Sequence, residues 1–97
     1  MHMKMITAVV RPFKLEELRQ AIAWLGVQGV TVTEVQEVQF GPRVKLEIAV
    51  DDPVLEPVLE ALANVARTGH RGDGRILVAP LEQAIRIRTG EMGPSAA

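Results

Sequence analysis

The sequence predicts an α+β fold in which two helices cover one face of a four-stranded antiparallel sheet. Three observations support this prediction. Four short segments have the apolar pattern of β-strands, two others have apolar residues at helical spacing, and the segments follow in the order β-α-β-β-α-β. Because each crossover is right-handed, both helices must lie on the same face. This is the ferredoxin-like architecture.

The first half of the chain contains two strands and a helix. Residues 5–10 are an almost unbroken apolar run that ends at Arg11-Pro12, which indicates a buried strand. Leucine and isoleucine then recur at helical spacing over residues 15–25, and Gly26 stands where a helix C-cap belongs. Gly29 opens the second strand, VTVTEV, in which valine and threonine alternate.

The second half repeats this pattern. VKLEIAV, residues 44–50, alternates apolar and polar residues as a strand does. Asp51-Asp52-Pro53 signals a helix start, but an interior proline costs about 3 kcal/mol, so we expect the regular helix to begin nearer Pro57. A short buried strand, ILVAP, follows a glycine-rich segment, and IRIRTG adds a short C-terminal strand.

Composition limits the class of protein. A length of 97 residues suits one domain, and a chain that is 47% hydrophobic with 3% aromatics needs an aliphatic core. The formal charge of −1 gives no general attraction to nucleic acid or to an anionic membrane. The absence of cysteine excludes disulfides and thiolate nucleophiles. With no apolar stretch of bilayer length, we expect a cytoplasmic protein without membrane insertion and without a nucleic-acid partner.

We expect a single domain over residues 1–97, with Met1 and His2 compatible with a cloning remnant and residues 92–97 forming a polar tail. The strands at 5–10 and 76–79 are apolar on both faces, whereas two helices cover only one side of the sheet. A second subunit is the economical source of cover for the other side, which predicts an oligomer. The alternative is that short strands leave some valine and alanine exposed.

The most informative stretch is TGHRGDGR, residues 68–75. Closely spaced glycines allow consecutive backbone N–H groups to converge on an anion, and Arg75 adds charge. The alternative is a flexible turn in which Gly69 only caps the preceding helix. Arg86 and Arg88, at i and i+2 on an extended segment, would point the same way about 6–7 Å apart and suit a polyphosphate.

Other readings of the charged residues remain open. The arginine pair could instead form a solvated edge or pair with Glu82 and Glu91. His70 has no evident acid partner, so an exposed position is expected. Nothing resembles a nucleophile–base pair or a set of metal ligands, so we expect neither an enzyme nor a metal site.

Five segments, RPFKLEELRQAI, GVQGVTVTEVQ, PRVKLEIAVDD, ARTGHRGDGRI and AIRIRTGE, together resemble the PII signal-transduction proteins over residues 3–91. The resemblance implies a ferredoxin-like homotrimer that binds ATP or ADP in clefts between subunits. Bound nucleotide and 2-oxoglutarate would report energy and carbon/nitrogen status to nitrogen-metabolism enzymes, an ammonium channel and transcriptional regulators.

The resemblance also implies which residues contact the nucleotide. They are Thr31, Glu47 and Ala49 at the adenine end, Gly72, Asp73, Gly74 and Arg75 around the phosphates, and Arg86 and Arg88 from the neighbouring subunit. His70-Arg71 replaces the family's usual lysine and aliphatic residue. Arg75 stands where the family has lysine, which keeps the charge.

One segment of the family pattern is missing. After TEVQ the family has a glycine-arginine-glutamine phosphate contact and a long mobile loop with the modified tyrosine, whereas here EVQFGPRVKLEIAV follows directly. Either the loop was deleted or it is disordered and omitted from the sequence; the regular spacing of the rest favours a clean excision. Apolar positions pass from 30 and 32 to 35, and such a parity change predicts a reversal of the buried face.

We therefore expect an ATP- or ADP-binding regulatory protein of nitrogen metabolism with a truncated effector loop. Its Mg-ATP/2-oxoglutarate site would be impaired, and partners that depend on the loop would be lost. The alternative is a non-signalling trimeric scaffold of the divalent-cation-tolerance type. An RNA-binding module would need stacking aromatics, which residues 44–50 lack.

Overall fold

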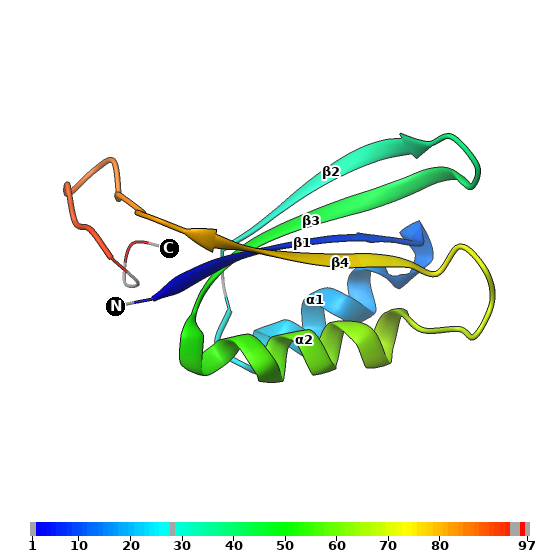
Figure 1. Ribbon diagram of the computed structural model, residues 1–97, viewed down its shortest axis with the longest axis horizontal. Helices are drawn as coiled ribbons and strands as arrows, with labels where there is room; N and C mark the ends of the chain where they lie inside the picture. Colours follow the sequence, from blue (N-terminus) through cyan, green and yellow to red (C-terminus); the bar gives the residue numbers. More distant parts are fainter. Residues whose placement is uncertain (1, 28, 94–95, 97) are drawn as a thin grey trace.

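The computed structural model describes residues 2–27, 29–93 and 96. Four antiparallel strands form one sheet in the order β2-β3-β1-β4, namely β1 (Met3–Val10), β2 (Val30–Glu37), β3 (Gly41–Asp51) and β4 (Gly74–Leu81). The helical elements are the 3-10 helix η1 (Pro12–Lys14), α1 (Leu15–Ala23) and α2 (Asp52–Ala66). Figure 1 shows α1 and α2 on one side of the sheet. The predicted α+β, ferredoxin-like fold is confirmed.

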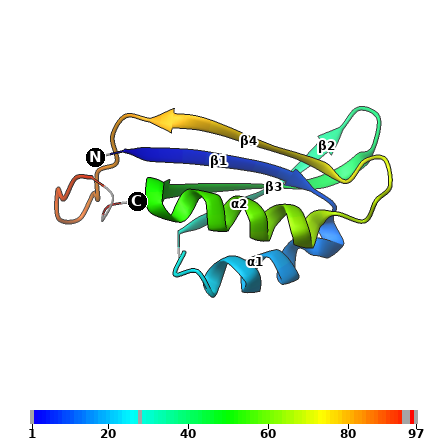
Figure 2. The same cartoon turned by 60° about the horizontal axis from the view of Figure 1, so that its bottom comes forward.

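The core lies between the two helices and the sheet (Figure 2). Ile6 of β1 and Ile48 of β3 are cross-strand partners with no exposed surface. Leu18 of α1 and Leu62 of α2 belong to the same buried cluster. Each fully buried aliphatic side chain of this kind contributes about 1.5–3 kcal/mol of transfer free energy. The residues of the buried core cluster are all aliphatic, as the composition predicts.

Helix α2 begins at Asp52, and the expectation that it begins nearer Pro57 is wrong. The Asp51 carboxylate accepts a hydrogen bond from the Asp52 amide at 2.9 Å, and Pro53 occupies the first turn. Pro57 lies in the second turn, where it removes one intrahelical hydrogen bond. The cap and the buried face of the helix, which includes Leu62, outweigh that loss.

Strands β2 and β3 form one uninterrupted hairpin, so the predicted reversal of the buried face is wrong. Pairing runs without a bulge from Val30↔Ile48 to Glu37↔Gly41, and residues 38–40 make the turn. Gly41, the first residue of β3, has φ of 77°, a left-handed conformation that favours glycine. Strand β1 ends opposite Val44, so the outer part of the hairpin pairs with no third strand. In that outer part of the hairpin, the alternation of apolar residues therefore does not determine which face is buried.

The C-terminal segment folds into a turn. Its short strand is reduced to a single bridge between Ile85 and Met92, and the Gly90 amide donates to the Arg86 carbonyl at 2.8 Å. Arg88 lies within this turn, so the expectation that Arg86 and Arg88 belong to one extended segment is wrong. The described part of the chain offers this segment no neighbouring strand, and a local turn pairs backbone groups instead. Arg86 also pairs with Glu91 at 3.5 Å, as the alternative reading allowed.

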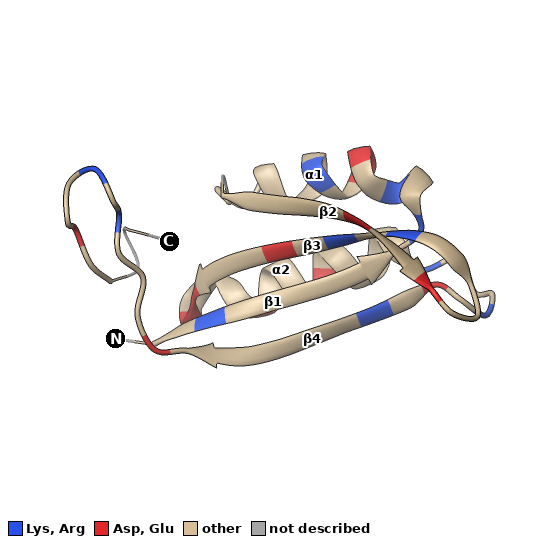
Figure 3. Ribbon diagram, turned by 90° about the horizontal axis from the view of Figure 1, so that it is seen from above, with Lys and Arg blue, Asp and Glu red and all other residues tan. Residues whose placement is uncertain are grey.

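Within the described residues, no helix covers the face of the sheet opposite α1 and α2 (Figure 3). Met5, Thr7 and Val9 of β1 point to this side, because the alternate residues Ile6, Ala8 and Val10 lie in the core. Leu77 of β4, the partner of Thr7, keeps 53% of its surface exposed. The exposed apolar side chains on this face, such as Leu77, favour oligomerisation, which stays a prediction. No helix within the described residues is long and apolar enough to cross a membrane.

Candidate functional site

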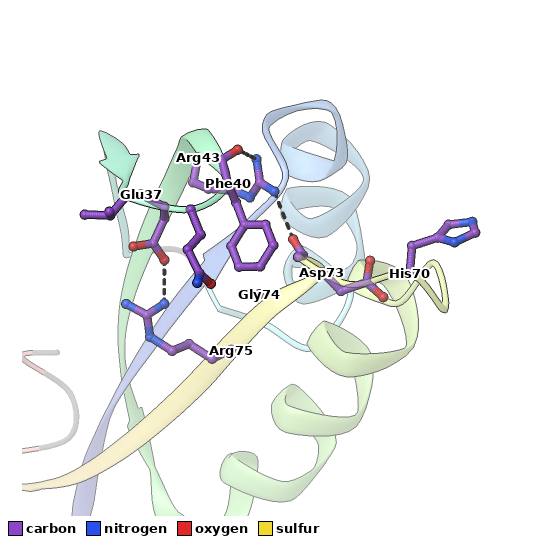
Figure 4. Close-up of a pocket in the computed structure, with 10 residues that line it drawn as sticks. Glu37, Phe40, Arg43, His70, Asp73, Gly74 and Arg75 are labelled. Carbon is purple, nitrogen blue, oxygen red and sulfur yellow. Dashed lines mark hydrogen bonds and ion pairs between the residues drawn. The ribbon is translucent and has the colours of Figure 1, made fainter.

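The glycine-rich loop joins α2 to β4 at the end of the molecule where the β2–β3 hairpin turns (Figure 1). Between the hairpin tip and the loop lies a cleft of about 480 Å³ (Figure 4). Its lining residues are Glu37, Val38, Gln39, Phe40 and Arg43 on the hairpin side, and His70, Gly72, Asp73, Gly74 and Arg75 on the loop side. Four of the residues predicted to surround phosphate therefore lie together in one cleft.

Asp73 organises the loop from within. Its carboxylate accepts hydrogen bonds from the hydroxyl and the amide of Thr68, the latter at 2.8 Å, and from the Gly69 amide at 2.9 Å. Arg11 Nε adds an ion pair at 3.2 Å. The Thr68 hydroxyl is the largest of the causes that hold the pKa of Asp73 well below its ordinary value. Asp73 is thus an ionised anchor that closes residues 68–73 into a ring.

Two glycines are required by the packing around the loop. At Gly74, with φ of 113°, a Cβ would lie 1.9 Å from the Val9 carbonyl oxygen. At Gly72, with φ of 88°, a Cβ would lie 2.8 Å from the Phe40 ring. The loop backbone therefore lies so close to β1 and to the hairpin tip that neither position leaves room for a Cβ atom.

The loop's carbonyl oxygens are held by two arginines that sequence reasoning did not assign to the site. Arg11 Nη2 donates to the Arg71 carbonyl at 2.8 Å, and Arg43 Nη2 donates to the Gly72 carbonyl at 3.1 Å. Among the described residues, no acceptor is recorded for the amides of Arg71 and Gly72. A loop with occupied carbonyls and unoccupied N–H groups suits an anion. Both arginines fall in quoted motifs, RPFK and PRVK, but neither motif indicates what they contact.

Arg75 is the cationic residue that is predicted to pair with phosphate, and its guanidinium already forms an ion pair within the chain. Arg75 Nη1 lies 2.5 Å from Glu37 Oε1 at the end of β2 (Figure 4). Sequence reasoning missed Glu37, because nothing in its neighbourhood indicates a partner 38 residues away. His70 is exposed, and Figure 4 shows its ring pointing away from Arg75. The described residues contain no group of three His, Cys, Asp or Glu side chains that could hold a metal ion.

The three residues predicted for the adenine end lie on the open face of the sheet. Thr31 and Glu47 are cross-strand partners on β2 and β3. Glu47 is also paired with Thr7, and Ala49 lies two residues further along β3 on the same face. Arg75 pairs with Val9 in the adjacent row, towards the glycine loop. The predicted adenine and phosphate residues thus occupy successive rows of one surface.

Arg86 and Arg88 do not join this surface within one chain. Figures 1 and 2 place their segment beyond the far end of β4, whereas the glycine loop precedes the start of β4. Strand β4 is eight residues long and separates the two, by about 25 Å on strand geometry. These arginines can act at the cleft only if they come from another copy of the chain.

Comparison with known proteins identifies related sequences and structures. The profile of the family described as nitrogen regulatory protein P-II matches residues 3–91. Nitrogen regulatory protein P-II of Cereibacter sphaeroides is 42% identical over 111 aligned positions, which cover 97% of this chain and 99% of the relative. Nitrogen regulatory protein GlnK of Escherichia coli K12 is 40% identical with the same coverage.

Solved structures with the same fold include two of a related protein. One is GlnK of B. subtilis, with a TM-score of 0.89, 32% identity and full coverage of both chains. The other is the B. subtilis GlnK–ATP complex, with a TM-score of 0.89 and 34% identity; the match covers 99% of this chain and 96% of that one. The described fold therefore agrees with these relatives over its whole length.

Proposed function

This chain belongs to the nitrogen regulatory protein P-II family, and we propose that it is a non-catalytic regulatory subunit that binds ATP or ADP and lacks the family's effector loop. One observation carries the proposal: a donor-rich glycine loop and Arg75 open onto the sheet face where Thr31 and Glu47 lie side by side. The similar B. subtilis GlnK was solved as an ATP complex.

The geometry suggests how a nucleotide would lie. Its phosphates would accept hydrogen bonds from the amides of Arg71 and Gly72 and would pair with Arg75. The nucleoside would extend along the open face towards Glu47 and then Ala49. Two row spacings separate the level of Arg75 from that of Ala49, about 13 Å on strand geometry. Asp73 would shape the loop without touching phosphate, since its carboxylate would repel the anion and is already bonded.

A homotrimer would complete this site. The open face leaves apolar side chains such as Leu77 exposed, and Ile87 of the C-terminal turn is 98% exposed. Burial of both surfaces in an assembly would bring Arg86 and Arg88 of one copy towards the cleft of the next, where two guanidinium groups suit a phosphate chain. The alternative, a non-signalling scaffold of the divalent-cation-tolerance type, would assemble without binding nucleotide.

The loss of the effector loop is supported by two features. An alignment of 111 positions with a chain of 97 residues leaves at least 14 positions of the relative without a counterpart. The hairpin closes through only three residues, 38–40, which begin one residue after TEVQ. The chain has no tyrosine, so it has no tyrosyl hydroxyl for uridylylation. We propose that binding to an ammonium channel and to other loop-dependent partners is lost with the loop.

Isothermal titration calorimetry of the full chain with ATP tests the proposal. Arg86→Ala combined with Arg88→Ala should weaken ATP binding by about tenfold or more, because each charge-assisted contact is worth roughly 1.5–3 kcal/mol. Arg19→Ala is the control, because Arg19 lies on α1, on the other side of the sheet. Absence of ATP binding to the parent chain would favour the scaffold. Equal affinity of the parent and the double variant would show that the two arginines do not reach phosphate.

A further inference from the structure

The cation of the cleft is held by a carboxylate of the same chain. Glu37 ends β2 and Arg75 is the second residue of β4, and these strands are the opposite edges of the sheet. The two side chains meet because the hairpin continues past the end of β1 and its tip reaches the glycine loop (Figure 4). The Glu37–Arg75 ion pair lines the same cleft as the unoccupied N–H donors. An anion that enters the cleft therefore encounters this ion pair.

We propose that Glu37 is a built-in anionic competitor that occupies Arg75 until a phosphate group displaces it. This inference rests on the proposed function, since the competing anion is the phosphate chain of the nucleotide. A carboxylate and a phosphate use the same donors of a guanidinium, so one excludes the other from the same position. Glu37 also places a negative charge where the phosphates would lie, which opposes their entry until the carboxylate turns away.

The exchange requires little rearrangement. The side chain of Arg75 is 53% exposed and that of Glu37 is 26% exposed, and ion pairs at such positions are weak. The other contacts between hairpin and loop do not involve Glu37. Arg43 donates to the carbonyls of Phe40, Pro42 and Gly72, and the Phe40 ring lies against Gly72. The hairpin tip can therefore stay in place while Glu37 alone moves.

The contact also distinguishes the cleft's two arginines. Arg43 is committed to three carbonyl oxygens and is almost fully buried, so it is not available to an anion without breaking the hairpin tip. Arg75 has only Glu37 as a recorded partner among the described residues. Of the two guanidinium groups that line the cleft, Arg75 is therefore the one that an anion can pair with once Glu37 turns away.

The test compares Glu37→Gln with Glu34→Gln in the full chain. Both remove one carboxylate from the same strand, but Glu34 pairs with Val44 and faces the helix side of the sheet, away from Arg75. Calorimetry with ATP and with inorganic tripolyphosphate, each with and without Mg²⁺, measures affinity. Glu37→Gln should bind both anions about three- to tenfold more tightly, and Glu34→Gln should differ from the parent by less than about twofold. In an Arg75→Gln background the gain should shrink, because no cation remains to be released.

The outcomes separate this inference from the proposed function. If Glu37→Gln binds ATP with an affinity equal to or lower than that of the parent chain, the proposal that Glu37 competes with phosphate is wrong, whereas the proposal of nucleotide binding stands. A loss of affinity seen only with Mg²⁺ would instead make Glu37 a ligand of the nucleotide's metal. Failure of both the parent chain and Glu37→Gln to bind ATP overturns both proposals. Circular dichroism and thermal unfolding of each variant establish that the fold is retained.

Discussion

Alanine substitutions at three glycines of the 68–75 loop should have sharply graded effects on stability. Gly69, Gly72 and Gly74 all have positive φ, at 88°, 88° and 113°. A Cβ on Gly69 would meet nothing within 4 Å, whereas one on Gly74 would lie 1.9 Å from the Val9 carbonyl oxygen. The series therefore separates the strain of the backbone conformation from the cost of steric overlap.

The expected magnitudes follow from these environments. Gly69→Ala should cost about 1 kcal/mol, the strain of a non-glycine residue at positive φ. Gly74→Ala carries the same strain and must also move β4 away from β1, where Val9 and Val10 are buried and Val10 pairs with Gly74. Partial exposure of these valines and loss of a backbone hydrogen bond add about 2 kcal/mol or more. Gly72→Ala should fall between, because the Phe40 ring at the hairpin tip can shift.

Thermal unfolding followed by circular dichroism measures the series, at one protein concentration because the Tm of an oligomer depends on it. For a domain of this size, 1 kcal/mol shifts Tm by about 4–8 °C, so Gly74→Ala should unfold about 8–16 °C below Gly69→Ala. The parent chain and Gly69→Ala together define the strain term. If the Tm of Gly74→Ala lay within about 3 °C of that of Gly69→Ala, the close approach of the loop to β1 would be refuted.

Other expected results concern acid stability, assembly and ligand coupling. The pKa of Asp73 is lowered in the folded chain, so its stabilisation is present above the ordinary value of 3.8 and declines as pH falls below it. Urea midpoints at pH 7 and pH 3 should therefore differ less in Asp73→Asn than in the parent. Light scattering should give three times the chain mass of 10.6 kDa, and a monodisperse monomer contradicts the trimer. Saturating 2-oxoglutarate with Mg²⁺ should leave ATP affinity unchanged, because the glycine-arginine-glutamine segment expected after TEVQ from the family resemblance is absent from this chain; a coupling of about fivefold would contradict this.

Secondary structure could be predicted wherever the signal is local. The alternation of VKLEIAV predicts β3, and Gly26 was expected to cap α1 and has φ of 83°. The fold class followed from element order and handedness. Pro57 was misjudged because its cost is also local, whereas the burial of the helix face that offsets it depends on the whole core. The alternation of IRIR predicts an extended segment for Arg86 and Arg88, but the described part of the chain offers that segment no neighbouring strand, and it forms a local turn.

In the candidate site, too, the features with a local sequence signal could be predicted and those that depend on tertiary contacts could not. The composition of residues 68–75 indicated an anion-binding loop, since closely spaced glycines have that property in any fold. The anchors of the loop could not be predicted, because Arg11 contacts Arg71 across 60 residues and no local pattern connects them. The family resemblance implies that Asp73 lies near the phosphates, which stays a prediction. Its bonds to Thr68 and Gly69, which show that it also shapes the loop, could not be predicted from the sequence.

The sequence by itself determined the order of strands and helices, the aliphatic core and the position of the glycine loop, because each depends on residues close together in the chain. Only the tertiary structure decided what faces that loop. Glu37 and Arg75 are 38 residues apart on opposite edge strands. They meet because the β2–β3 hairpin extends beyond the end of β1, and its three-residue turn packs against Gly72. Such a contact depends on the length and direction of paired strands, which no single segment encodes.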